Sequence, residues 1–320
     1  MTKLNKKLFR TFNKKIILVT GGTGSIGSEI VRQILPYRPK QVRVYSRDES
    51  KHFFLEQELK KLSSPVDIKY FIGDIRDKDR LEKAFQGVNI VFHAAALKHV
   101  PYCENNSFEA IKTNVYGTQN IIDLAIKNNV DRLIAISTDK AVYPNNVMGI
   151  TKLLMEKMVI CSKYYSGSAL TKFSVVRFGN VMNSRGSVIP VWINQINEGG
   201  PVTVTDKRMK RFFMSIPDAV NLVFLAATLM KGQEIFVLKM DEENIYQLAK
   251  KTIIKNSNSK KIKIKIVGKR NGEKITEKLF TDEEKELLIE CKKFYIVLPD
   301  EIKVKKFLKY YQTMEQMLYK

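Results

Sequence analysis

Short apolar runs alternate with amphipathic segments along the first 178 residues of the chain. The apolar runs have the length of buried strands, and the segments between them repeat their apolar positions with the period of a helix. We expect strands at 15–20, 41–45, 68–72, 89–93, 132–137 and 173–178, and helices at 25–35, 49–62, 77–85, 106–128 and 149–164. This alternation predicts an α/β fold with a doubly wound parallel sheet, in which ligands bind beyond the carboxyl ends of the strands.

The pattern changes near Gly179, where turn-rich loops begin to dominate. Beyond that point we expect a helix at 218–230, a strand at 234–239, a short helix near Tyr246, a strand at 261–267 and a charged helical tail. Residues 1–178, with about 212–240, are therefore assigned to the doubly wound domain. Residues 179–211 and 241–320 are assigned to a smaller substrate-binding region over the strand ends.

Composition places the chain among ordinary globular proteins. Of its 320 residues, 44% are hydrophobic and 28% are charged, which excludes disordered and collagen-like chains. Cys103, Cys161 and Cys291 lie too far apart for a disulfide framework or a zinc ribbon, so we expect a reducing, cytoplasmic setting. No signal peptide and no apolar stretch of about 20 residues is evident, and no membrane association is expected.

The net charge of +22 could attract nucleic acid, a membrane surface or a phosphorylated small molecule. Many lysines fall in short runs, at 250–251, 260–265 and 303–306, without the interleaved aromatic residues of a single-strand binder. These runs are typical of solvated faces, and we expect no specific nucleic-acid partner. Binding of an anionic ligand has to be argued from local motifs.

A glycine-rich turn follows the first expected strand. Gly21, Gly24 and Gly27 form G-x-x-G-x-x-G at the start of a helix, with Thr23, Ser25 and Ile26 between them. In this position the glycines allow a tight turn, close approach of a pyrophosphate and close helix packing, while the helix amino terminus faces the anion. The turn therefore predicts a dinucleotide site.

The end of the second strand indicates which dinucleotide binds. A carboxylate there would accept from a ribose hydroxyl, whereas an arginine would bind a 2'-phosphate. Ser46 and Arg47 follow the strand and favour NADP; Asp48 keeps NAD open as the alternative. Further small or polar residues after the third and fourth strands are expected to border the cofactor, namely Asp74, Ile75, Ala94, Ala95 and Ala96.

A candidate reactive pair stands at the end of the strand at 132–137. Asp139 and Lys140 follow Ser137 and Thr138 at the edge where a parallel sheet presents its ligands. A carboxylic acid and an amine placed there could act as general acid and general base. On the dipeptide alone, a surface charge pair at a strand exit is the stronger interpretation.

Seven motifs together resemble the UDP-N-acetylglucosamine 4,6-dehydratases, a group of extended short-chain dehydrogenases/reductases in surface-polysaccharide pathways. They are GGTGSIG from Gly21, YSRDE from Tyr45, GDIRD from Gly73, FHAAALKHVP from Phe92, STDKA from Ser137, RFGNVMNSRGSVIP from Arg177 and RNGEK from Arg270. They extend over nearly the whole chain. The resemblance implies a Rossmann domain that binds NADP, a UDP-sugar-binding region, and a homo-oligomer, either a dimer or a hexamer.

One position departs from the superfamily pattern. Most members use Tyr-x-x-x-Lys, but Met148 stands four residues before Lys152 and cannot transfer a proton. The resemblance implies that Lys152 still binds the nicotinamide ribose. Removal of the proton from the sugar's 4-hydroxyl would then fall to Asp139, Lys140, Thr138 or a bound water. Tyr143 lies five residues too early and is expected to pack.

The resemblance further implies a closed redox cycle. Hydride leaves carbon 4 of the sugar, Lys140 removes the proton on carbon 5, Asp139 protonates the leaving 6-hydroxyl, and hydride returns to carbon 6. Lys98 and Asn114 are implied near the cofactor, and the substrate is implied to contact Lys98, Met148, Asn180, Arg185, Val188, Thr203, Arg211, Arg270 and Glu273. Arginine suits the diphosphate because its planar fork can donate to two oxygens.

Two other functions stay open. A UDP-sugar 4-epimerase would need no elimination acid and would normally keep the tyrosine. A non-catalytic nucleotide- or RNA-binding protein is motivated by the charge and by Met148. No metal is expected, because His93 and His99 lack ligating companions.

Overall fold

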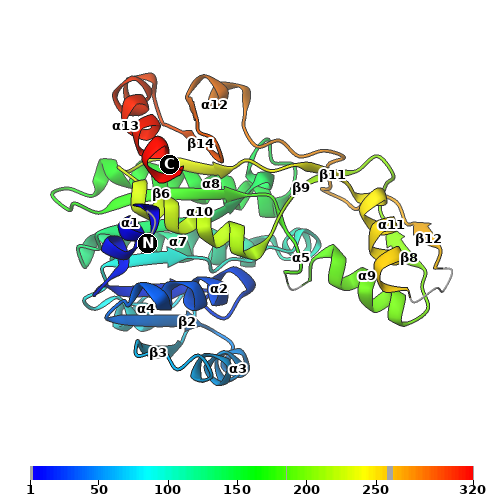
Figure 1. Cartoon of the computed structure of the whole chain (residues 1–320), viewed down its shortest axis with the longest axis horizontal. Helices are drawn as coiled ribbons and strands as arrows, with labels where there is room; N and C mark the ends of the chain where they lie inside the picture. Colours follow the sequence, from blue (N-terminus) through cyan, green and yellow to red (C-terminus); the bar gives the residue numbers. More distant parts are fainter. Residues whose placement is uncertain (1–2, 185, 258–261, 320) are drawn as a thin grey trace.

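The computed structural model describes residues 3–184, 186–257 and 262–319, which fold around a nine-stranded sheet (Figure 1). The strand order is β13-β14-β10-β6-β5-β4-β1-β2-β3; all neighbours from β10 to β3 pair in parallel, and β14 and β13 are antiparallel. The strands are β1 (Ile16–Thr20), β2 (Gln41–Ser46), β3 (Asp67–Ile72), β4 (Ile90–His93), β5 (Arg132–Thr138), β6 (Lys172–Phe178), β10 (Ile235–Leu238), β13 (Leu288–Glu290) and β14 (Phe294–Val297). This arrangement confirms the predicted doubly wound sheet.

Helices cover both faces of the sheet, which explains why its central strands are apolar on both sides. One face is packed by α1 (Lys3–Phe12), α2 (Ser25–Ile34), α3 (Glu49–Lys60) and α10 (Ile216–Leu229). The other is packed by α4 (Lys78–Phe85), α7 (Gly117–Lys127) and α8 (Val147–Tyr165). The turns η1 (Leu35–Tyr37) and η3 (Asp139–Ala141), helix α12 (Asp282–Glu286) and helix α13 (Glu301–Tyr319) complete this part.

A small lobe lies beyond the carboxyl ends of the strands, at the right of Figure 1. It consists of α9 (Val188–Asn197), β8 (Val202–Val204), α11 (Ile245–Asn256) and β12 (Ile264–Ile266). Its own apolar core is built on Trp192 and Ile196 of α9. A three-stranded sheet of β7 (Asn180–Val181), β9 (Lys210–Met214) and β11 (Glu242–Asn244) connects the lobe to the main sheet.

Three differences from the sequence prediction concern the main sheet and the helices that pack on it. The helix expected at 106–128 is divided into α6 (Ser107–Ile111), a π-turn (Lys112–Tyr116) and α7, preceded by α5 (Val100–Asn105). Residues 288–297 extend the main sheet, although 241–320 had been assigned to the substrate region. Helix α1 was not expected at all. Within the described residues, no helix is both long enough and apolar enough to cross a membrane.

Candidate active site

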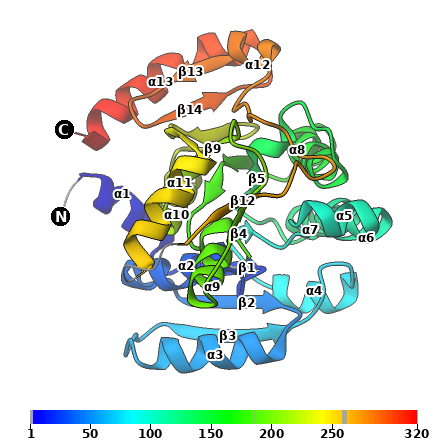
Figure 2. The same ribbon diagram turned by 90° about the vertical axis from the view of Figure 1, so that its right-hand side faces the viewer.

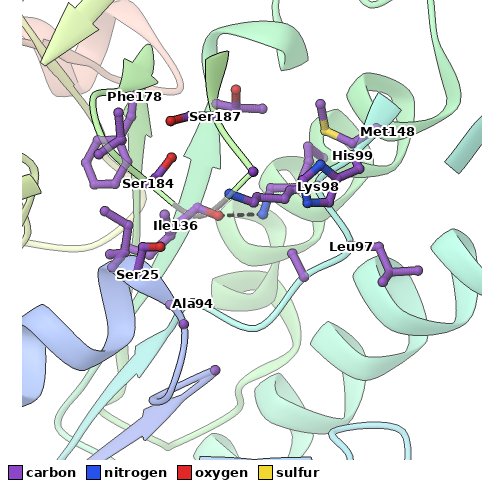
Figure 3. Close-up of a pocket in the computed structure, with 18 of the residues that line it drawn as sticks. Ser25, Ala94, Leu97, Lys98, His99, Ile136, Met148, Phe178, Ser184 and Ser187 are labelled. Atoms are coloured by element: carbon purple, nitrogen blue, oxygen red, sulfur yellow. Dashed lines mark hydrogen bonds between the residues drawn. The ribbon is translucent and has the colours of Figure 1, made fainter. Parts of the chain in front are cut away.

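A cavity of about 860 Å³ lies between the main sheet and the small lobe (Figure 3). Most residues singled out in the sequence line it: Gly21, Thr23, Gly24, Ser25, Ile26, Gly27, Ser46, Arg47, Asp74, Ile75, Ala94, Ala95, Ala96, Lys98, Thr138, Lys140, Met148, Lys152, Asn180, Val188, Arg211, Arg270 and Glu273. In Figure 3, Ser25 and Ala94 lie at one end of the cavity and His99 and Met148 at the other, with Lys98 between them.

The glycine turn has no room for side chains. Gly21 has φ of +65°, and a Cβ on it would lie 2.7 Å from the amide nitrogen of Ala95. A Cβ on Gly27 would lie 2.2 Å from the carbonyl oxygen of Gly21. Helix α2 begins directly after Gly24, so its amino terminus faces the cavity. This is the geometry that a dinucleotide pyrophosphate requires.

The end of β2 presents Ser46 and Arg47 to the cavity. The hydroxyls of Ser46 and Thr23 are hydrogen-bonded at 2.8 Å. The Arg47 guanidinium is 55% exposed and lies 3.5 Å from the Asp74 carboxylate. The Asp48 carboxylate caps α3 by accepting from the amide of Lys51 at 3.0 Å. Arg47 is therefore the more available of the two candidate ligands.

A buried histidine lies where the strand order reverses, between β1 and β4. Thr118 Oγ1 donates to the carbonyl of Asn114 at 2.7 Å, so it accepts from His93 Nε2 at 3.0 Å. Thr20 Oγ1 then donates to His93 Nδ1 at 2.8 Å. Burial and the nearby Lys152 charge lower the pKa of His93 to about 3. His93 is therefore neutral and serves as a fixed bridge between the strands and α7.

Lys140 is the centre of a polar cluster at the end of β5. Its Nζ donates to Asp139 Oδ1 at 2.9 Å and to Asn180 Oδ1 at 3.2 Å, and lies 3.8 Å from Glu277 Oε1. Thr138 Oγ1 also donates to Asp139 Oδ1, at 2.9 Å. The second oxygen of Asp139 and one oxygen of Glu277 are buried without a hydrogen-bond partner in the described residues. Asp139 is thus fully buried and Lys140 is only 20% exposed, so the interpretation as a surface charge pair is wrong.

Helix α8 holds Met148 and Lys152 on the same wall. Asn146 caps this helix by accepting from the amide of Gly149 at 2.8 Å. Met148 is buried with Cys103 and Ala110. Lys152 donates to the carbonyl of Ile136 and to the Met155 sulfur. Burial lowers the pKa of Lys152 to about 8, against the opposing effect of Glu156.

The segment 270–277 closes the cavity from the side of the small lobe. Within this segment, the carbonyl of Gly272 accepts from Asn146 Nδ2 at 2.9 Å. Glu273 accepts from the amide of Arg270 at 3.0 Å. Arg211 donates to the carbonyls of Ile275 and Lys274 at 3.0 and 2.8 Å. Arg211 lines the cavity, but its guanidinium mainly holds this segment in place.

Three predicted residues are placed elsewhere, and a fourth is not described. Asp139 is fully buried behind Lys140 and does not line the cavity. Asn114 bonds the main chain of Leu97 and the Thr151 hydroxyl, so it fixes the loop that carries Lys98. Thr203 bonds Gln195 inside the small lobe. Arg185 lies outside the described residues.

Sequence reasoning missed several cavity residues, among them Glu277, Asn146, Phe178, Ser184 and Ser187. Asn146 could have been found from the sequence, because an asparagine just before a predicted helix is a typical N-cap. Glu277 carried none. It reaches Lys140 only because Arg211 holds the segment between 270 and 277 against β9.

Residues 17–299 match the sequence profile of a family described as polysaccharide biosynthesis protein. The chain therefore belongs to this family of α/β proteins. An uncharacterized membrane protein of Methanocaldococcus jannaschii is 52% identical over 293 residues, which cover 90% of this chain and 87% of that protein.

Two curated relatives carry different activities in their names. A UDP-N-acetylglucosamine 4,6-dehydratase (inverting) of Campylobacter jejuni is 42% identical over 290 residues, covering 90% of this chain and 84% of that one. A UDP-glucose 4-epimerase of Rickettsia rickettsii is 42% identical over 293 residues, with the same coverage. Among solved structures, Pen from Bacillus thuringiensis is 42% identical with a TM-score of 0.87, and 90% of each chain is covered.

Proposed function

We propose that this protein is a sugar-nucleotide-modifying enzyme, and specifically a UDP-N-acetylglucosamine 4,6-dehydratase that forms a UDP-4-keto-6-deoxy sugar. The observation that carries the proposal is Lys140, partly exposed to the cavity and held by Asp139, Asn180 and Glu277, in one cavity with a glycine-rich turn. An elimination needs an acid and a base within reach of one substrate, and this cluster supplies both. A relative 42% identical carries this activity in its name.

The cavity fits a nicotinamide dinucleotide at the end that the glycine turn forms. The turn leaves no space for a Cβ on Gly21 or Gly27, and the amino terminus of α2 faces the space that a pyrophosphate would fill. Arg47 would hold a 2'-phosphate, which supports NADP over NAD, and Lys152 would donate to the nicotinamide ribose. The chemistry that such a cofactor supplies is reversible hydride transfer with carbon atoms of the sugar.

The protein's own groups would move the protons. The proton of the sugar's 4-hydroxyl, released as hydride leaves carbon 4, would pass to Asp139, Lys140, Thr138 or a bound water. Lys140 Nζ would take the proton from carbon 5 of the sugar and later return one to it. Asp139 is sealed from the cavity, so its proton would reach the leaving 6-hydroxyl through Thr138 Oγ1, which bonds Asp139 and lines the cavity. For this step Asp139 would be protonated and the Thr138–Asp139 hydrogen bond would reverse: Thr138 would give its proton to the leaving oxygen and take the proton of Asp139. Met148 would contribute packing only.

The other end of the cavity would hold the nucleotide of the substrate. Arg270 and Val188 line it, and Glu273 would accept from a ribose hydroxyl. The division of the chain into an NADP-binding domain and a UDP-sugar-binding region belongs to this proposal. A homo-oligomer, either a dimer or a hexamer, and a cytoplasmic location stay predictions.

Incubation with UDP-N-acetylglucosamine tests the proposal. A dehydratase removes one water from the substrate, which mass spectrometry of the product detects. A UDP-sugar 4-epimerase is the second candidate, because a relative 42% identical is named as one, and it would give an isomer of equal mass. An unchanged substrate together with tight RNA binding would contradict both enzymes. NMR of the product at carbon 5 would distinguish inversion from retention.

A further inference from the structure

A second cavity, of about 1270 Å³, lies at the amino ends of the parallel strands, opposite the candidate active site. Helix α1 forms one wall and lies at the left of Figure 1, whereas the small lobe lies at the right. The lining is strongly basic: Lys3, Lys6, Lys7, Arg10, Lys15, Arg132 and Lys172. Within the described residues, Asp131 is the only acidic residue of this lining, and it is paired with Lys15 at 2.9 Å.

The fold places two of these cations side by side on neighbouring strands. Arg132 begins β5, Lys172 begins β6, and the two are register partners in the parallel pair. Like charges in this arrangement repel each other and destabilise the sheet locally. Arg132 is held in place because it donates to the carbonyl of Ala227 near the end of α10.

Helix α1 brings further cations to the same place. Leu8 and Phe12 bury its apolar face in the main core, and Figure 2 shows this helix close to α13. Lys7 Nζ donates to the Met314 sulfur at 3.2 Å. Both Lys7 and Lys231 lie over the Tyr310 ring, at 6.0 and 4.0 Å from its centroid.

Few carboxylates lie near the cations of this cluster in the described part of the chain: Asp131 favours the charged forms of Arg132 and Lys172, and Glu234 that of Lys172. No ion pair with a carboxylate forms there for Lys7, Arg132, Lys172 or Lys231. The nearby Glu234 is fully buried and accepts from the Ser174 and Tyr311 hydroxyls.

Besides burial, repulsion between these cations lowers the pKa of two of the groups. Burial, and then the positive charge of neighbouring side chains, lowers the pKa of Lys7 and of Lys172. Burial also lowers the pKa of Arg132. An anion bound among these groups would remove the repulsion and stabilise their charged forms.

We propose that this basic cavity is a binding site for a compact anion that carries several phosphate groups. Lys7, Lys15, Arg132 and Lys172 are partly buried in this cavity, whereas Lys3, Lys6 and Arg10 of α1 are exposed beside it. A small polyphosphate that enters the cavity can contact several of the partly buried cations together. A flat bilayer or an RNA strand would meet mainly the three exposed cations of α1. The site is separate from the candidate active site and does not depend on the proposed function.

Titration calorimetry with inorganic triphosphate tests this site. NADP and UDP are added first in excess, so that the phosphate positions of the active site are filled. We expect one triphosphate per chain, with an affinity that falls steeply between about 50 and about 300 mM salt. Lys172→Gln and Lys7→Gln should each weaken binding by about tenfold, and Lys172→Arg should retain most of it.

Lys255→Gln is the matched control, because Lys255 is exposed on α11, remote from this cavity, and the substitution removes the same charge. Absence of triphosphate binding would overturn the proposal. An equal loss of affinity in Lys255→Gln would also overturn it, because it would indicate general charge attraction. Phosphatidylglycerol vesicles and a short single-stranded RNA are tested in parallel. Binding of either one without binding of triphosphate would also overturn it. Unfolding curves confirm that each variant is folded.

Discussion

Lys140, Asp139 and Met148 make distinct contributions at the scale of single residues. Lys140→Ala should abolish both product formation and the exchange of the carbon 5 proton with solvent deuterium, while UDP-sugar binding stays nearly intact. Asp139→Asn should slow elimination by about a hundredfold to ten-thousandfold, so that the 4-keto sugar builds up. NMR in deuterated water and mass spectrometry measure these effects. Met148→Leu is the packing control and should leave the activity nearly unchanged. A loss of activity equal to that of Lys140→Ala, without unfolding, would contradict the assignment of Met148 to packing.

Thr138 is the link between the buried Asp139 carboxyl and the cavity. Thr138→Val preserves the shape of the side chain but removes the hydroxyl that bonds Asp139 at 2.9 Å. We expect the rate of water loss to fall by about a hundredfold, within the range of general acid catalysis. Thr138→Ser keeps a hydroxyl and should retain most of the rate. Equal rates in the valine and serine variants, measured by mass spectrometry of the product, would exclude the relay.

Helix α8 tunes the charge of Lys152 at the scale of an element. The side chain is charged below about pH 8 and neutral above it, because burial lowers its pKa from 10.5. The affinity for an anionic dinucleotide should therefore be highest below pH 8 and fall as the pH rises through that value. Lys152→Arg stays charged and should show no such fall between about pH 7 and pH 10. Calorimetric titration with NADP measures both profiles, and identical profiles would contradict this interpretation.

A buried ionic network attaches α12 to the sheet and to α8. Arg177 is 1% exposed and donates to both Glu156 and Glu284, at 2.7 and 2.8 Å. Arg177→Met would leave the buried Glu156 carboxylate and the partly buried Glu284 carboxylate without this counterion, and should lower the free energy of unfolding by about 3–5 kcal/mol. Arg32→Met, which breaks the half-exposed pair with Glu58, should cost at most about 1 kcal/mol. Urea unfolding compares the two; similar losses would contradict a structural role for the network.

The parallel core could be predicted from sequence because its strands and helices each carry their own apolar period. Elements that depend on distant partners could not. Strand β13 is three residues long and becomes a strand only by pairing with β14. The π-turn forms where the Asn114 side chain bonds the loop at Leu97, a contact that no local pattern encodes.

In the candidate active site, too, some positions could be predicted from the sequence and others could not. The glycine turn and the Asp139–Lys140 pair follow strands directly, so their position at the sheet edge could be read from the order of elements. Glu277 joins Lys140 from a segment 137 positions later in the chain, and Thr203 turns inward to Gln195 inside the small lobe. Such placements depend on how the lobe packs, which the sequence pattern does not show.

At the scale of the whole molecule, part of the +22 charge lines two cavities at opposite ends of the sheet. At the carboxyl ends, the basic residues Arg47, Lys98, Lys140 and Arg270 line the candidate active site together with acidic groups such as Asp74 and Glu277. At the amino ends, the second cavity is lined by seven basic side chains and one acidic one. The lining of the second cavity therefore has a larger excess of basic over acidic residues than that of the candidate active site.

The proposed closed redox cycle predicts that the purified protein contains its cofactor. Because the hydride returns to the sugar, the cofactor has no need to leave, and the cavity between sheet and lobe should retain it through purification. Chromatography of the supernatant after denaturation should show NADP in preference to NAD. Arg47→Ala should weaken the affinity for NADP much more than that for NAD, since the 2'-phosphate would lack its cation. Arg208 is exposed on the small lobe, so Arg208→Ala should change neither affinity. Absence of any dinucleotide, with no stimulation of activity by added NADP or NAD, would contradict the redox mechanism. Equal losses of affinity for NADP and NAD in Arg47→Ala would instead indicate Asp48 as the ribose ligand.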